Sequence, residues 1–246
     1  MTRGPAEWIP YCGAAPLPGE LLARWNLDPP LLLTIGLAVA LACWLPRLRT
    51  PANAAALAVV LLLFVSPFCA LGSALFSARV VHHLVLALVL APLLALAFEP
   101  ARWLERWSLP VLTALQAIVF WAWHAPALYS LALSNDTAFW LMQLSITATS
   151  ALWWAKLRQS PAAASVAALL ATMVQMGLLG ALLTFAGRAF YAPHWLTTQV
   201  WGFSPLEDQQ VAGLIMWAPG AAAYLLVAAA ILYRSLGGSD ARPAKA

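Results

Sequence analysis

Long apolar stretches recur along this chain and are separated by short polar connections. Seven stretches approach the roughly 20 residues that a helix needs to cross a bilayer. They cover residues 30–45, 53–71, 80–98, 109–131, 137–155, 162–186 and 207–233, and the first is the shortest. The pattern predicts an all-α fold, a polytopic membrane helix bundle with seven transmembrane helices.

Basic residues in the connections predict the orientation of this bundle, because cytoplasmic loops carry an excess of lysine and arginine. One side of the threaded chain holds Arg47, Arg49, Arg102, Arg106, Lys156, Arg158, Arg234, Arg242 and Lys245. The other side holds Arg3, Arg24, Arg79 and Arg188. We therefore expect the N-terminus outside and the C-terminus in the cytoplasm. The predicted organisation is an extracytoplasmic segment over 1–29, a transmembrane domain over 30–233 and a disordered cytoplasmic tail over 234–246.

The composition agrees with a protein that lives in lipid. The chain is 63% hydrophobic and 9% charged, with a mean hydropathy of +0.81, whereas a soluble domain carries about 25% charged residues. The net charge is +4, but the 13 basic residues form no run dense enough to follow a phosphate backbone. The expected surroundings are a lipid bilayer, and nucleic acid is not an expected partner.

All four histidines fall on the outer side of the predicted bundle: His82, His83, His124 and His194. Imidazole is the side chain most used for metal ligation and proton handling. His82 and His83 are adjacent and point about 100° apart on a helix, so we expect at most one of them to face the interior. Either both are interfacial histidines wetted by headgroups, or at least one is a ligand or proton carrier. His194 is expected to be only a loop residue.

His124 lies below the interface, where an ionisable residue is a functional candidate. Pro126 follows it and removes a backbone hydrogen bond, which predicts a kink and a free carbonyl at Ala122. The alternative is a neutral histidine that bonds to this freed backbone.

Methionine and acidic side chains extend the set of candidate ligands. Met142 and Met216 lie in the outer parts of their segments, and thioether with imidazole suits Cu(I). The alternative is that both methionines fill core space. Asp208 follows a capping box that begins at Ser204 and ends at Glu207. It could cap that helix start, orient a histidine or receive a cation.

Small residues and cysteines carry structural expectations. Gly180 and Gly213 lie on stripes of small residues that let membrane helices approach closely. Cys12 and Cys69 could form a disulfide, although nothing in the sequence supports one, and Cys43 falls near the opposite membrane face.

Three stretches resemble the CtaG family. They are SARVVHHLVLALVLAPLL at 77–94, WAWHAPALYSLAL at 121–133 and DQQVAGLIMWAPG at 208–220. This family is implicated in assembling heme–copper cytochrome c oxidases of the caa3 type. The resemblance implies a multi-pass protein of the bacterial inner membrane that is not an enzyme.

The family motifs carry over to this chain with departures in two of them. His83 falls on a family histidine, but Arg79 replaces the first histidine of the usual HxxxH pattern. The usual LHxLEH pattern reads FWLMQL here, so Trp140, Gln143 and Leu144 replace two histidines and a glutamate. If the family's metal site uses those groups, this chain either lacks the site or forms it from other residues.

The resemblance implies a membrane assembly factor that assists copper delivery to the CuB centre of the oxidase. We expect a transient extracytoplasmic Cu(I) site with His83 and His124 at its core. The assisting residues would be His82, Met142, Met216 and Asp208. The expected partners are the oxidase catalytic subunit and an extracytoplasmic copper chaperone. The alternatives are a metal-free scaffold or accessory subunit, and a b-type cytochrome with two histidine axial ligands.

Overall fold

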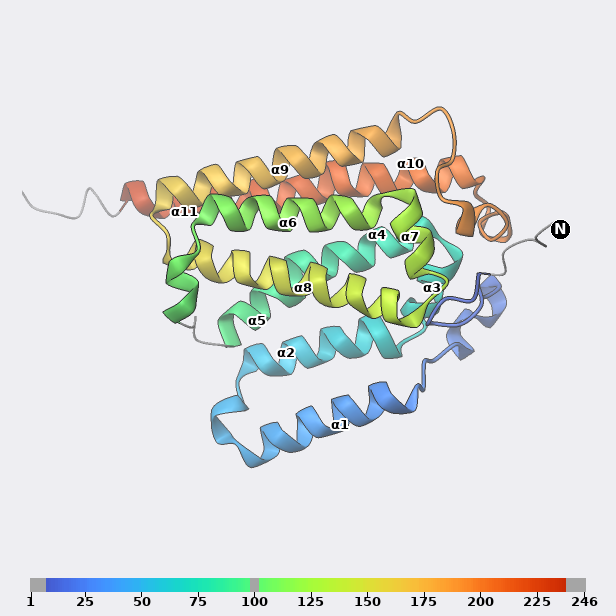
Figure 1. Ribbon diagram of the computed structural model, residues 1–246, viewed down its shortest axis with the longest axis horizontal. Helices are drawn as coiled ribbons and strands as arrows, with labels where there is room; N and C mark the ends of the chain where they lie inside the picture. Colours follow the sequence, from blue (N-terminus) through green and yellow to red (C-terminus); the bar gives the residue numbers. More distant parts are fainter. Residues whose placement is uncertain (1–7, 98–101, 238–246) are drawn as a thin grey trace, which may run out of the picture.

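The computed structural model describes residues 8–97 and 102–237, and every regular element in these ranges is a helix (Figure 1). The longer elements are α1 (Pro29–Trp44), α2 (Pro51–Val60), α3 (Phe68–Ala74), α4 (Phe76–Val85), α5 (Ala91–Ala97), α6 (Leu109–His124), α7 (Pro126–Ala132), α8 (Asp136–Gln159), α9 (Ala162–Thr184), α10 (Pro205–Ile215) and α11 (Ala221–Gly237). Wider π-helical turns continue three of them: η3 (Leu61–Val65) extends α2, η4 (Leu86–Leu90) joins α4 to α5, and η8 (Met216–Gly220) joins α10 to α11. Short 3₁₀ turns are η1 (Pro18–Ala23), η2 (Pro46–Leu48), η5 (Arg102–Arg106), η6 (Ala192–His194) and η7 (Gln199–Trp201).

The helices run along the long axis of the molecule and pack side by side (Figure 1). α9 packs on the continuous helix formed by α10, η8 and α11. α6 packs on both α9 and α8. α8 then contacts α5, and α5 contacts α2. α1 lies beyond α2 at the edge of the bundle (Figure 1).

Three described helices are long and apolar enough to cross a membrane: Phe76–Ala97, Ala162–Thr184 and Pro205–Leu236. Two bent helix pairs raise this number to five if each is one span. α1, with 16 residues, is a shorter apolar helix. The all-helical class is therefore confirmed, and the apolar helices mark a membrane protein. The seven-span arrangement and its orientation stay predictions.

The expected boundaries need two corrections. The stretch 53–71 is not one straight helix, because it bends by 44° between η3 and α3, where Pro67 interrupts the helix. Residues 234–237 of the predicted tail are helical, since α11 continues to Gly237. The remainder of that tail, 238–246, lies outside the described residues.

Pro126 creates the predicted kink. α6 ends at His124, α7 begins at Pro126, and the two helices meet at 75°. The carbonyl of Ala122 is not left free, because the backbone N–H of Ala125 donates to it at 3.1 Å. This tightened turn places His124 at the last position of α6.

Glycines bring α9 and α10 into direct backbone contact, as their stripes predicted. A Cβ atom added to Gly180 would lie 2.7 Å from the carbonyl oxygen of Gly213 and 2.9 Å from the backbone nitrogen of Trp217. These neighbours are backbone atoms that cannot rotate away, so both positions require glycine.

A disulfide joins Cys12 to Cys69 in α3, with 5.5 Å between their Cα atoms. The sequence offered no support for it, because the pairing depends on how the N-terminal segment folds over α3. Asn26 fastens the same segment through its side-chain amide, which donates to the carbonyl of Phe64 at 3.0 Å. Cys43 is free and exposed.

We predict that Gly180→Ala lowers the free energy of unfolding by about 1–3 kcal/mol, because the new methyl group forces the α9 and α10 backbones apart. Thermal unfolding in detergent measures the change. Gly36→Ala in α1 is the control, since nothing lies within 4 Å of its added Cβ, and alanine favours helix. Equal melting of the two variants would contradict the packing role.

Candidate functional site

All four histidines are buried, which corrects two expectations. His82 and His83 are both fully buried, although at most one was expected to face the interior. α4 is enclosed on several sides, by α3 and α10 among others, so directions 100° apart both point into protein. His194, expected to be only a loop residue, is 2% exposed at the end of η6.

His83 and His124 form the closest imidazole pair. Their ring centroids lie 5.2 Å apart and the ring planes are nearly perpendicular. Nδ1 of His124 lies 2.7 Å from the carbonyl oxygen of Phe120. A carbonyl only accepts hydrogen bonds, so Nδ1 carries the proton and Nε2 keeps a lone pair. That Nε2 atom and both nitrogens of His83 are buried without a hydrogen-bond partner.

His82 adds a third imidazole beside this pair. Its ring centroid lies 6.2 Å from that of His83, and its two nitrogens also lack partners. Phe64 and Phe68 flank the ring at 5.0 and 6.1 Å. His82 therefore sits in an apolar pocket next to the pair.

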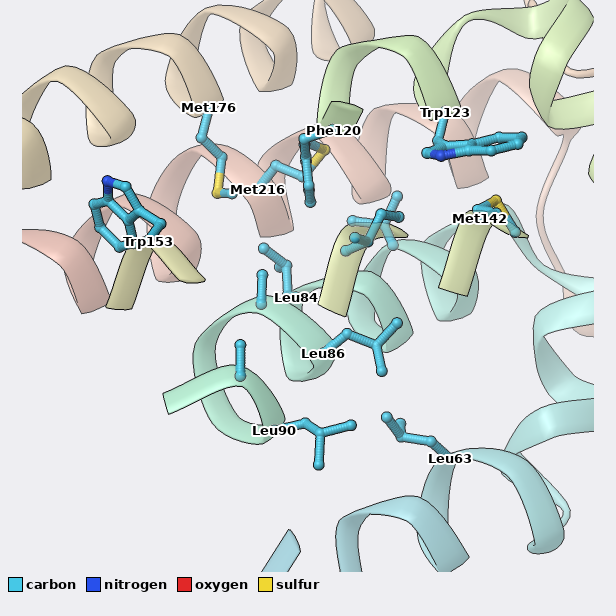
Figure 2. Close-up of a cluster of buried hydrophobic side chains, with 14 of the residues drawn as sticks. Leu63, Leu84, Leu86, Leu90, Phe120, Trp123, Met142, Trp153, Met176 and Met216 are labelled. Atoms are coloured by element: carbon cyan, nitrogen blue, oxygen red, sulfur yellow. The ribbon is translucent and has the colours of Figure 1, made fainter. Parts of the chain in front are cut away.

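The two candidate methionines are fully buried but lie in separate parts of the core. Figure 2 shows Met142 near Trp123, and Met216 in the region of Met176 and Phe120. Phe120 stacks on His124 at 4.5 Å. Among the described residues, no group of three or more histidine, cysteine or acidic side chains is placed to hold a metal ion. The strongest ligand candidates are therefore the imidazoles, whose rings adjoin one another.

Asp208 caps α4 rather than its own helix. Its carboxylate accepts hydrogen bonds from the backbone N–H groups of Phe76 and Ser77 at 2.6 and 3.2 Å, and from the Ser77 hydroxyl at 2.5 Å. The cap of α10 is the predicted box between Ser204 and Glu207. Both oxygens of Asp208 are thus engaged at the start of the helix that carries His82 and His83. Asp208 thereby fixes the first turn of the helix that carries these histidines.

Arg79 is a fully buried cation, 0% exposed, and no acidic side chain of the described residues pairs with it. Its three guanidinium nitrogens make no well-formed hydrogen bond within that part of the chain, although the Tyr129 hydroxyl interacts with the charge. Its guanidinium carbon lies 5.3 Å from the ring centroid of Phe139. Gly72 allows this placement, because a Cβ there would come within 2.9 Å of the same carbon. Arg79 precedes His83 by one helical turn, so its charge repels any cation held by the imidazoles.

The segment between α9 and α10 closes one end of the site. Nε2 of His194 lies 2.6 Å from the Tyr129 hydroxyl, and the Tyr191 hydroxyl donates to the His124 carbonyl at 2.8 Å. Phe76 stacks on Tyr191 at 3.8 Å. Sequence reasoning missed these contacts, and the aromatic content of this segment was the only signal for them.

The three α8 residues that depart from the family pattern occupy different environments. Leu144 is exposed, and Trp140 is half-buried and stacks on Phe64 at 5.2 Å. Gln143 is buried, and neither atom of its side-chain amide has a partner. A polar residue inside an apolar helix was the signal that could have marked Gln143.

The comparisons agree with the resemblance carried by the motifs. A family model described as cytochrome c oxidase caa3 assembly factor (Caa3_CtaG) matches residues 33–237. The matched range extends from α1 to the end of α11 and includes every helix that carries a candidate ligand. Neither a curated protein nor a solved structure matches the chain.

The buried His194 predicts a pH-dependent stability. Burial lowers the pKa of its imidazole to about 3, whereas an unfolded histidine titrates near 6.5. As the pH falls, the unfolded chain therefore binds this proton before the folded protein does. The contribution of the neutral His194 to the free energy of unfolding is complete above pH 6.5 and is lost as the pH falls toward 3. We expect a loss of about 1.4 kcal/mol at pH 5.5.

Unfolding of the protein and of His194→Gln, measured from pH 7.5 to 5.5, isolates this contribution. The stability difference between the two should narrow by that amount, because glutamine does not titrate. Parallel pH profiles would show that His194 is not neutral and buried in the folded protein.

Proposed function

Because the chain belongs to the cytochrome c oxidase caa3 assembly factor family, we propose that it carries Cu(I) transiently on His83 and His124 during oxidase assembly. Copper is the cargo in this proposal, and the recipient is the CuB centre of a heme–copper oxidase catalytic subunit. An extracytoplasmic copper chaperone supplies the metal. The protein acts by binding and release and not as an enzyme.

One observation supports the copper role above the others. Two adjacent buried imidazoles have ring nitrogens with no hydrogen-bond partner among the described residues. Each unsatisfied buried polar group costs about 1–3 kcal/mol, and hydrocarbon supplies no water to replace the lost bond. Neutral imidazole nitrogen is a good ligand for copper. A ligand that accepts these lone pairs offsets the cost, and His124 already presents the correct tautomer at Nε2.

The small number of donors suits a site that must release its metal. His82 is a further imidazole, with its ring centroid 6.2 Å from that of His83, and the buried thioethers of Met142 and Met216 are the soft donors of the proposed set. Arg79 adds repulsion beside the bound cation. A copper ion held by two ligands beside a positive charge is favoured to transfer to a partner that offers more ligands.

The proposed topology directs this site toward the source of copper. In a seven-span bundle with its N-terminus outside, the starts of α4 and α10 and the end of α6 lie at the outer face. The segment that includes η6 then forms an outer cover over the histidines. The protein would be a multi-pass component of the bacterial inner membrane, open to an extracytoplasmic donor.

A metal-free scaffold is the second candidate, and Arg79 favours it. An unpaired guanidinium beside His82 and His83 disfavours any cation, and both oxygens of Asp208 are already bonded to α4. A b-type heme fits less well. The rings of His83 and His124 are already in contact at 5.2 Å, which leaves no space for a flat macrocycle between them.

We predict that His83→Ala with His124→Ala weakens Cu(I) binding by more than about 100-fold, because both core ligands are lost. Competition with a Cu(I) chelator on the purified protein measures the affinity. CuB occupancy of the co-expressed oxidase should fall as well. Ser150→Ala removes another buried, unpartnered polar atom and should leave both readouts unchanged. Full CuB occupancy with the double variant would contradict the proposal.

We also predict that Arg79→Met tightens Cu(I) binding by about 100-fold. A unit charge about 6 Å away contributes roughly 3 kcal/mol of repulsion at an effective dielectric constant near 20. The exposed Arg188→Met is the control for loss of a cation. Unchanged affinity in Arg79→Met would place the bound copper away from α4.

A further inference from the structure

α1 is fastened to the protein at both ends but hardly packed along its length. At its start, Asp28 caps the helix and accepts the hydroxyl of Tyr11 at 2.7 Å, and Asn26 bonds to Phe64. At its end, the Arg49 guanidinium donates to the carbonyls of Ala42 and Cys43. Between these anchors only Leu31 of the 16 residues is buried. Figure 1 shows α1 set apart at the edge of the bundle.

A cleft of about 1160 Å³ separates α1 from the rest of the bundle. Its walls are mainly apolar side chains of α1, α2 and α8 and the segment from η4 to α5, with Ile35, Ala38 and Leu94 among them. The cleft extends from Tyr11 and Asp28 at one end of α1 to Arg49 at the other. A long hydrocarbon chain matches this shape and lining.

The Asp28 end of the cleft is aromatic. Tyr11, Phe64 and Trp140 line it, with Trp140 stacked on Phe64 at 5.2 Å and edge-on to Tyr11 at 5.1 Å. Rings arranged in this way offer faces and edges to a flat conjugated group.

Gln143 also lines the cleft, one helical turn from Trp140, and is only 1% exposed. Both the nitrogen and the oxygen of its side-chain amide lack partners. Such an amide can donate one hydrogen bond and accept another. A hydrocarbon chain satisfies neither atom, so an occupant with a polar group at this depth fits better than an acyl chain alone.

We propose that the cleft binds a lipid of the isoprenoid quinone class, with its ring beside Trp140 and Gln143 and its tail between α1 and the bundle. The amide of Gln143 donates to a ring carbonyl, or accepts from a ring hydroxyl in the reduced form. Arg49 is the one cation among the described lining residues, and it lies at the opposite end. The aromatic end, beside the acidic Asp28, therefore favours an uncharged head over a phosphate.

A transmembrane helix of a partner fits this cleft less well. The backbone amides of such a helix are bonded within it, so an apolar helix face would leave both atoms of the Gln143 amide without a partner among the described residues. The quinone site contains none of the proposed copper ligands, although Phe64 lines the cleft and also flanks His82 at 5.0 Å.

Titration of the purified full-length protein in detergent with a decyl-substituted benzoquinone tests the proposal by calorimetry. We expect saturable binding that Gln143→Leu weakens about tenfold, because one buried hydrogen bond is lost. Gln116→Leu, a buried glutamine outside the cleft, should bind like the unaltered protein. Ala38→Phe fills the cleft from α1 and should abolish quinone binding. This variant keeps the proposal testable if Gln143→Leu does not fold.

Three outcomes would overturn the proposal. They are no saturable binding to the unaltered protein, full affinity in Ala38→Phe, and equal affinity in folded Gln143→Leu and Gln116→Leu. Displacement of the quinone by phosphatidylglycerol at equal concentration would assign the cleft to phospholipid instead. Copper affinity should be the same with and without quinone, so failure here leaves the copper proposal standing.

Discussion

The hydrogen bonds from the start of α4 to Asp208 are the contact on which the candidate site depends. The first N–H groups of any helix have no partner within the helix, and in an apolar bundle water cannot replace them. Asp208 satisfies two of them from α10, across more than 130 residues of sequence. This contact fixes the start of the helix that carries Arg79, His82 and His83. The close approach of α9 to α10 at Gly180 and Gly213 in turn fixes α10.

The site combines groups that attract a cation with one that repels it. Imidazole nitrogens of His83 and His124 lack partners, and so does the guanidinium of Arg79. Each is expensive to bury without a partner, and a protein that only needed a stable core would replace them with apolar side chains. Under the proposed copper role, opposed contributions of this kind would make binding weak and reversible. That property suits a protein that passes copper on and does not keep it.

Features set by local sequence could be predicted, and features set by distant contacts could not. The helical class, the kink at Pro126 and the capping box at Ser204 follow from periodicity and neighbouring residues. The pair of His83 with His124 was also proposed from sequence, and the structure brings their rings together. The burial of both His82 and His83, the bonding of His194 to Tyr129 and the cross-helix role of Asp208 depend on packing between remote segments. The Cys12–Cys69 disulfide depends on it in the same way.

X-ray absorption spectroscopy of the purified protein loaded with one equivalent of Cu(I) tests the central claim most directly. The account predicts a low-coordinate copper bound by imidazole nitrogens, at most one sulfur ligand, and loss of this spectrum when His83 and His124 are both replaced by alanine. A spectrum dominated by sulfur ligands, or one that survives the double replacement, would contradict it.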